Sequence, residues 1–139
     1  MANIYIDYNI SNQKSIYQPG DIISGTFSLK NRGNQDEKLK KVIIKYVEYF
    51  YSRERVIIKR VWNPIIKTLK ETVVDKGRII KANEKLEYRF KFKLPISWKN
   101  RKSPKIKDWK ISLCFFEKTG LISTTGIDGN GVYEVPISQ

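Results

Sequence analysis

The residues best suited to chemistry lie in one basic, aromatic segment, residues 98–110. Six bases and one acid fall between Lys99 and Lys110, and a tryptophan stands near each end. Clustered cations attract phosphates, and neighbouring aromatic rings can stack on nucleic-acid bases. The same residue types suit contact with an anionic membrane surface. The candidate partner-binding residues are Trp98, Lys99, Arg101, Lys102, Lys105, Lys107 and Lys110.

A plainer interpretation of this segment also stands, as a solvated loop between strands with Trp109 pointing into the core. The sequence shows no helix-turn-helix, RNA-recognition signature or zinc finger beside the basic residues. A second basic cluster, Lys38, Lys40 and Lys41, could bind a phosphate or an acidic tail. Its alternative interpretation is exposed charge at the junction of a loop and a strand.

The remaining residue types argue against catalysis and metal binding. Histidine is absent, which excludes Ser-His-Asp and Cys-His nucleophilic sites and imidazole metal sites. Cys114 is the single cysteine, so it can form neither an intrachain disulfide nor a thiolate zinc cage. Its alternating apolar surroundings predict a buried, inert thiol. The segment 128–131, Asp-Gly-Asn-Gly, is typical of a hairpin turn and lacks the spacing of a calcium loop. We therefore expect no enzyme activity, cofactor or metal.

Length and charge bound the function further. The chain of 139 residues is the length of one domain, and we expect a single domain over residues 1–139. Its net charge is +13, with +8 from residues 38–84 and +8 from residues 85–118. A charged face of this kind attracts acidic partners, although lysines that alternate along strands also form an ordinary wet face. The N-terminus has no secretory pattern and no apolar run could span a membrane, so we expect a cytoplasmic protein.

Alternating apolar and polar residues predict strands over most of the chain. The alternation is clearest in residues 85–94, and it recurs in residues 4–10, 23–30 and 109–116. Lys40–Tyr51 is apolar on both faces, which predicts a buried strand with a bulge. Because no stretch has a helical apolar stripe, the pattern favours an antiparallel β-sandwich.

The middle of the chain carries weaker strand signals. Residues 53–62 are expected to form a strand that ends at Asn63-Pro64, and residues 68–74 another. Gly77 is expected to mark the turn that follows, because glycine readily adopts the positive φ of many turns.

Several segments resemble the arrestin-like family. Ile16–Gly25, IYQPGDIISG, resembles its opening "vYxpGDxvsG", and Ile80–Pro95 resembles its "l.aGxhxfpFxfxlP" segment. Asn83 stands where that second pattern has glycine, and asparagine also tolerates the left-handed conformation. Lys40–Tyr51 and Pro104–Phe116 resemble two further strands, so the likeness covers most of the chain. The family includes arrestins, alpha-arrestins, a retromer cargo-recognition subunit and a prokaryotic sporulation-control group.

The resemblance implies an all-β fold, a single immunoglobulin-like antiparallel β-sandwich of seven to nine strands. It further implies a non-enzymatic scaffold or adaptor that binds other proteins through a sheet edge or a concave sheet face. Members usually have two such domains in tandem, so we expect two chains to associate as a homodimer. The lysine pair that precedes the first strand of receptor-binding arrestins is missing, so phosphoreceptor sensing is not implied. The alternative function is nucleic-acid or anionic membrane-surface binding through the basic segment.

Overall fold

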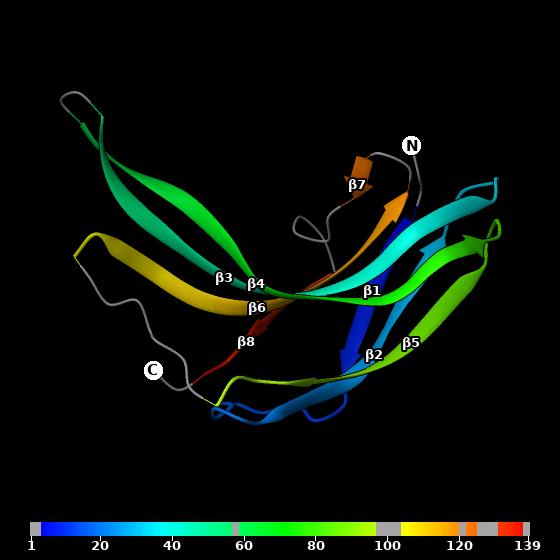
Figure 1. Ribbon diagram of the computed structural model, residues 1–139, viewed down its shortest axis with the longest axis horizontal. Helices are drawn as coiled ribbons and strands as arrows, with labels where there is room; N and C mark the ends of the chain where they lie inside the picture. Colours follow the sequence, from blue (N-terminus) through cyan, green and yellow to red (C-terminus); the bar gives the residue numbers. More distant parts are fainter. Residues whose placement is uncertain (1–3, 57–58, 97–103, 120–121, 125–130, 138–139) are drawn as a thin grey trace.

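The computed structural model describes residues 4–56, 59–96, 104–119, 122–124 and 131–137. Over these residues the chain forms eight strands in two antiparallel sheets, which make a β-sandwich (Figure 1). This confirms the expected all-β sandwich. No helix of a length and apolarity that would span a membrane occurs in the part of the chain described. The strands are β1 (Ile4–Ile10), β2 (Ile22–Asn31), β3 (Glu37–Val56), β4 (Lys59–Ile80), β5 (Lys85–Lys93), β6 (Ile106–Thr119), β7 (Ile122–Thr124) and β8 (Val132–Val135).

The smaller sheet has the strand order β1-β2-β5. Its strands follow the alternation seen in the sequence, because one face packs on the core and the other meets solvent. In β2 the side chains of Ile23, Phe27 and Leu29 are buried, while those between them are exposed or half-buried. Phe90 and Phe92 of β5 are buried in the same way. The strand predictions for this sheet are confirmed.

The larger sheet has the order β4-β3-β6-β7, and β8 pairs with β6 beside β7. β3 and β4 are 20 and 22 residues long and pair along their length as one hairpin. Together with the start of β6 they extend beyond the smaller sheet as a three-stranded arm (Figure 1). The arm is the part of the fold that the sequence patterns did not predict.

The predicted boundaries in this region are wrong. The expected strand over residues 53–62 spans the reversal of the hairpin, since the ladder runs up to Val56 and Lys59. Pro64 and Gly77 do not end strands: both lie within β4, where Gly77 has φ 67°. The physical reason is that β4 pairs only with β3 among the described residues. An edge strand tolerates proline because its missing N–H faces solvent.

Bulges set which side chains face outward. The register shifts between Tyr46 and Val47 and between Val42 and Ile43 leave Leu69 and Val74 of β4 as extra residues. A further shift, between Tyr49 and Tyr51, leaves an extra residue on β6, where Asp108 has φ 56°. The expected irregularity in the Lys40–Tyr51 strand is therefore present.

The core lies between the two sheets, and Phe115 of β6 marks its centre. The ring of Phe115 lies 5.0 Å from that of Phe27, 5.1 Å from Phe90 and 5.4 Å from Tyr8, between centroids. Because Ile44 pairs with Phe115, the even-numbered residues of β3 near it face inward. The odd-numbered residues Lys45, Val47 and Tyr49 therefore face the opposite, outer side of the larger sheet.

Two turns and one close approach agree with the family patterns. Gly20 has φ 86°, in a turn where Asp21 N–H donates to the Gln18 carbonyl at 3.1 Å. Asn83 has φ 62°, the left-handed conformation that asparagine tolerates. Gly25, the last residue of the opening pattern, lies where β1 and β2 approach closely. A Cβ atom added there would overlap the carbonyl oxygen of Asn9.

Candidate functional site

The outer face of the arm carries a row of aromatic and basic side chains on three strands. Strand pairing places Tyr49 of β3 between Ile66 of β4 and Lys110 of β6. Two residues further along β3, Tyr51 pairs with Pro64 and Lys107, and then Arg53 pairs with Trp62. Partners in an antiparallel ladder share a face, so these side chains gather on one surface. The aromatic–basic surface consists of Tyr49, Tyr51, Arg53, Trp62, Ile66, Lys107 and Lys110.

Cations lie over the aromatic rings of this surface. The Lys107 Nζ lies 4.5 Å from the centroid of the Trp62 ring and 5.8 Å from that of Tyr51. The Lys110 Nζ lies 5.0 Å from the Tyr49 ring, and the Arg53 guanidinium 6.0 Å from Trp62. These distances are those of cation–π contacts, which hold the flexible basic side chains against the rings.

The two tyrosines form one unit. Their rings meet edge to face at 5.5 Å between centroids, and the Tyr49 hydroxyl donates to the Tyr51 hydroxyl at 3.1 Å. This hydrogen bond is the main cause that raises the pKa of Tyr49 above its usual value. Because Tyr49, Tyr51 and Trp62 are all half-buried, each presents part of a ring to solvent.

A hollow of about 400 Å³ continues the surface toward β8. Ile66 at its rim is 45% exposed, a large fraction for an aliphatic side chain in a sheet. The lining residues are Val47, Tyr49, Ile66, Lys110, Ser112, Cys114, Val132 and Glu134. An apolar floor with a few polar groups at its edge suits the side chain of a partner.

The surface carries more positive than negative charge, although the Asp108 carboxylate lies close enough to Tyr49 to help raise the pKa of that tyrosine. Lys110 approaches Glu134 at 3.8 Å, but both side chains are exposed, so the pair contributes little. Within the described residues neither Lys107 nor Arg53 has a carboxylate partner. The surface therefore presents positive charge beside its aromatic rings.

The predicted basic segment is placed only in part. Trp98, Lys99, Arg101 and Lys102 lie outside the described residues. Lys107 and Lys110 belong to the aromatic–basic surface, whereas Lys105 contributes a backbone carbonyl that accepts from Arg53 N at 2.7 Å. Trp109 is only 8% exposed and points into the core, as the plainer interpretation holds.

Three aromatic residues of the surface were not predicted from the sequence. Tyr49 and Tyr51 alternate on one side of a strand that seemed apolar on both sides, and Trp62 lay near an expected strand end. Only the register that pairs Tyr51 with both Pro64 and Lys107 brings them together.

The second predicted cluster lies at the other end of β3. Lys38, Lys40 and Lys41 are exposed and lie within the strand, while Leu39 between them is fully buried. Lys41 and Tyr49 are eight positions apart along the strand, a distance of about 26 Å. The two basic regions are therefore distinct, and Lys38, Lys40 and Lys41 do not contribute to the aromatic–basic surface.

Cys114 forms part of the hollow's floor. It is 2% exposed, and burial raises the pKa of its thiol to about 11, opposed by the nearby Lys45 ammonium. A thiol in this state is a poor nucleophile at neutral pH. No group of three or more cysteine and carboxylate side chains in the described part of the chain is placed to hold a metal ion.

Solved structures supply the comparison that decides the fold. The sequence matches no protein-family model and no curated protein. The structure superposes on Spo0M, a sporulation control protein from Bacillus subtilis, with a TM-score of 0.71 over 100% of this chain, at 13% sequence identity. This chain has an arrestin-like fold. The likeness to Spo0M covers 51% of that protein, so the chain spans about half the length of this relative.

Two other similar structures are much more distant. They are the alkylpurine DNA glycosylase AlkC of Pseudomonas fluorescens bound to DNA, TM-score 0.46, and a β-glucosidase from Erythrobacter marinus, TM-score 0.41. Each is 10% identical in sequence, and they cover 100% and 99% of this chain but only 31% and 16% of their own. At these TM-scores neither bears on the function.

Proposed function

We propose that this protein is a non-enzymatic regulatory adaptor that binds an acidic segment of another protein on its aromatic–basic surface. The observation that carries the proposal is that the Lys107 ammonium lies over the rings of Trp62 and Tyr51, on a face of the sheet that points to solvent. The arrestin-like fold supports it, because Spo0M, which shares the fold, is a control protein.

The composition of the surface is that of a protein interface. Tyrosine, tryptophan and arginine are the residues most enriched among those that dominate binding energy. The hollow beside Ile66 would take an apolar side chain of the partner, and the cations around it would pair with carboxylates. Charge complementarity argues for an acidic segment, since Arg53 and Lys107 have no carboxylate partner in the described chain.

Nucleic-acid binding is the alternative, and one observation speaks for it: aromatic rings and cations alternate as in single-strand binding grooves. The rings of Tyr49, Tyr51 and Trp62 are, however, already covered in part by lysine and arginine side chains. Base stacking would have to displace these cations from the rings. We therefore favour an acidic protein segment over nucleic acid as the partner.

The test combines a peptide array with matched variants. Nuclease-treated wild-type protein is applied to acidic peptides with apolar residues and to their lysine-substituted counterparts. We expect binding to the acidic members alone, lost in Trp62→Ala and weakened in Lys107→Gln. Tyr5→Ala is the matched control, because Tyr5 is also half-buried and lies 3.8 Å from the Arg32 guanidinium, but on the smaller sheet.

Parallel arms decide between the partner classes. Single-stranded DNA and anionic vesicles are titrated at two ionic strengths, together with capture from native extract. Nucleic-acid binding that falls steeply with salt and depends on Trp62 would overturn the adaptor proposal, as would peptide binding that survives Trp62→Ala. Association of two chains, expected from the sequence, stays a prediction that sedimentation at micromolar concentration tests.

A further inference from the structure

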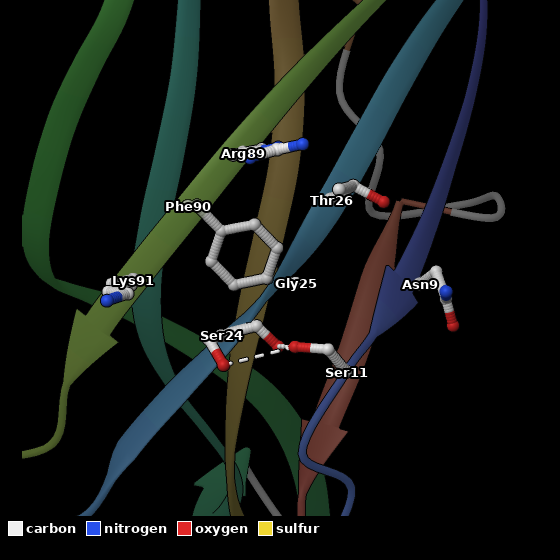
Figure 2. Close-up of a pocket in the computed structure, with 8 residues that line it drawn as sticks. All are labelled: Asn9, Ser11, Ser24, Gly25, Thr26, Arg89, Phe90 and Lys91. Atoms are coloured by element: carbon white, nitrogen blue, oxygen red, sulfur yellow. Dashed lines mark hydrogen bonds between the residues drawn. The ribbon is translucent and has the colours of Figure 1, made fainter.

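The outer face of the smaller sheet carries a second hollow, of about 530 Å³, open to solvent above Gly25. It lies on the opposite sheet from the aromatic–basic surface. Most of the surface that lines it is apolar, and the polar groups around it are one carboxamide, three hydroxyl groups and two cations. The lining residues are Asn9, Ser11, Ser24, Gly25, Thr26, Arg89, Phe90 and Lys91 (Figure 2).

Strand register arranges these side chains in rows. Asn9, Thr26 and Arg89 form one row across β1, β2 and β5. The next row holds Ser24 beside Lys91, with Ser11 joined to Ser24 by its backbone N–H at 2.9 Å. Neighbouring strands are about 4.8 Å apart, so a three-strand row spans about 10 Å. A small molecule can therefore reach all three strands at once.

Two of the three hydroxyl groups, those of Ser11 and Ser24, are held in place by the protein itself. Ser11 Oγ donates to the Ser24 carbonyl at 3.0 Å and lies 3.1 Å from Ser24 Oγ. Figure 2 shows this pair below Gly25, and the Arg89 side chain reaching from β5 toward the strand that carries Thr26. Polar groups fixed before a ligand arrives lose little entropy on binding.

Basic and acidic side chains lie at opposite ends of this face. Within the described residues neither Arg89 nor Lys91 has an ion-pair partner. The row on the other side of Thr26 is acidic, because Asp7 and Glu87 flank Ser28 there. These two carboxylates line a smaller adjoining hollow together with one cation, Lys85. An anionic group is thus attracted to the Arg89–Lys91 end and repelled from the Asp7–Glu87 end.

We propose that this hollow binds a small phosphorylated polyol. Its phosphoryl group is held by the Arg89 guanidinium and the Lys91 ammonium, which match phosphate by charge and hydrogen bonding. Its hydroxyl groups bond to Asn9 and Thr26 and donate to the carboxylates of the acidic row. A volume of about 530 Å³ exceeds what a phosphate ion alone would fill and is within the range of small-ligand sites.

Calorimetric titration with glucose 6-phosphate, glucose and inorganic phosphate, at constant ionic strength, tests the proposal. We expect glucose 6-phosphate to bind more tightly than inorganic phosphate, and glucose to show no binding. Arg89→Gln is expected to weaken glucose 6-phosphate binding about tenfold or more, the effect of losing one charge-assisted hydrogen bond. Lys93→Gln is the matched control, since Lys93 is an exposed lysine on the same face of the same strand, about 13 Å from Arg89, and lines neither hollow.

Three outcomes would overturn it. They are no binding by the wild type, equal affinity for inorganic phosphate and glucose 6-phosphate, and equal losses in Arg89→Gln and Lys93→Gln. The last would mean that only the net charge matters. Circular dichroism and a thermal scan of each variant separate loss of binding from loss of fold. The result is independent of the adaptor proposal, because Trp62 and Lys107 lie on the other sheet.

Discussion

The indole Nε1 of Trp109 donates a hydrogen bond of 2.7 Å to Oε2 of Glu48 inside the sandwich. The two residues lie on paired strands, β6 and β3, and are 8% and 5% exposed. A carboxylate at this depth is costly unless hydrogen-bond donors compensate it. The bond therefore joins β3 and β6 inside the core, where the arm begins. It also explains why the Trp109 side chain is not part of the aromatic–basic surface.

Trp109→Phe is expected to lower the free energy of unfolding by about 1.5–3 kcal/mol, the range for a hydrogen bond to a charged group. Urea denaturation followed by circular dichroism measures the change. Trp62→Phe is the control, because Trp62 is half-buried on the outer face and its ring contacts cations. Equal losses in the two variants would contradict the importance of the Glu48 contact.

Gly25→Ala is expected to destabilise the protein by about 1–3 kcal/mol, the usual cost of overpacking. The added methyl group would collide with backbone atoms of Asn9 and Ile10, which move only if β1 shifts away from β2. Thermal or urea unfolding measures the loss. Ser28→Ala, on the same strand but facing outward, should change stability by only a few tenths of that amount. If Gly25→Ala left the stability unchanged, β1 and β2 would be shown to move apart at no cost in free energy.

Tyr46 gives stability a dependence on alkaline pH. Burial, with the nearby Glu48 carboxylate as a second cause, raises the pKa of Tyr46 to about 12 from the ordinary 10. The folded state therefore holds a proton that the unfolded chain releases near pH 10. This contribution to stability is complete below pH 10 and is lost as the pH rises through about 12.

Tyr46→Phe should remove this pH dependence and so make the fall in stability between about pH 10 and 12 shallower by about 1.4 kcal/mol per pH unit. At neutral pH it should be neutral or slightly stabilising, since the Tyr46 hydroxyl has no hydrogen-bond partner in the described part of the chain. Urea titrations at several pH values measure both effects. An unchanged alkaline slope would disprove the assignment to Tyr46.

Cys114 should react slowly with alkylating agents while the protein is folded. Its side chain is 2% exposed and the pKa of its thiol is raised to about 11, so little thiolate exists at pH 8. We expect labelling by iodoacetamide to be about a hundredfold faster in urea than in buffer, because the thiolate is the nucleophile. Mass spectrometry at timed intervals gives the rates. Comparable rates would mean that the floor of the hollow opens readily.

Much of the sandwich could be predicted from alternation alone. Leu86, Phe90 and Phe92 follow a simple period of two because their sheet has one wet face and one buried face. Asn83, which stands where the resembled pattern has glycine, adopts the left-handed conformation that asparagine tolerates. The alternation depends on local sequence, which is why the strand predictions for this sheet succeed.

The arm could not be predicted in this way. Its strands are longer than most strands in globular proteins. Pro64 and Gly77 indicate strand ends in the sequence, and only the pairing shows that β4 is an edge strand that tolerates them. Lys107 is far from Tyr51 and Trp62 in the sequence, and it meets them only through a β3–β6 register that contains a bulge at Asp108. Pairing of distant strands, rather than local pattern, creates the site.

The exposed edge of β4 has one more consequence. Val61, Leu69, Val73 and Ile79 along it are at least 39% exposed, and such a row would normally invite strand-to-strand growth into fibrils. Pro64 withholds an amide, the extra residues at Leu69 and Val74 break the regular spacing, and Gly77 kinks the backbone. Pro64 and Gly77, which obscured this strand in the sequence, thus also oppose the addition of a further strand at the open edge of β4.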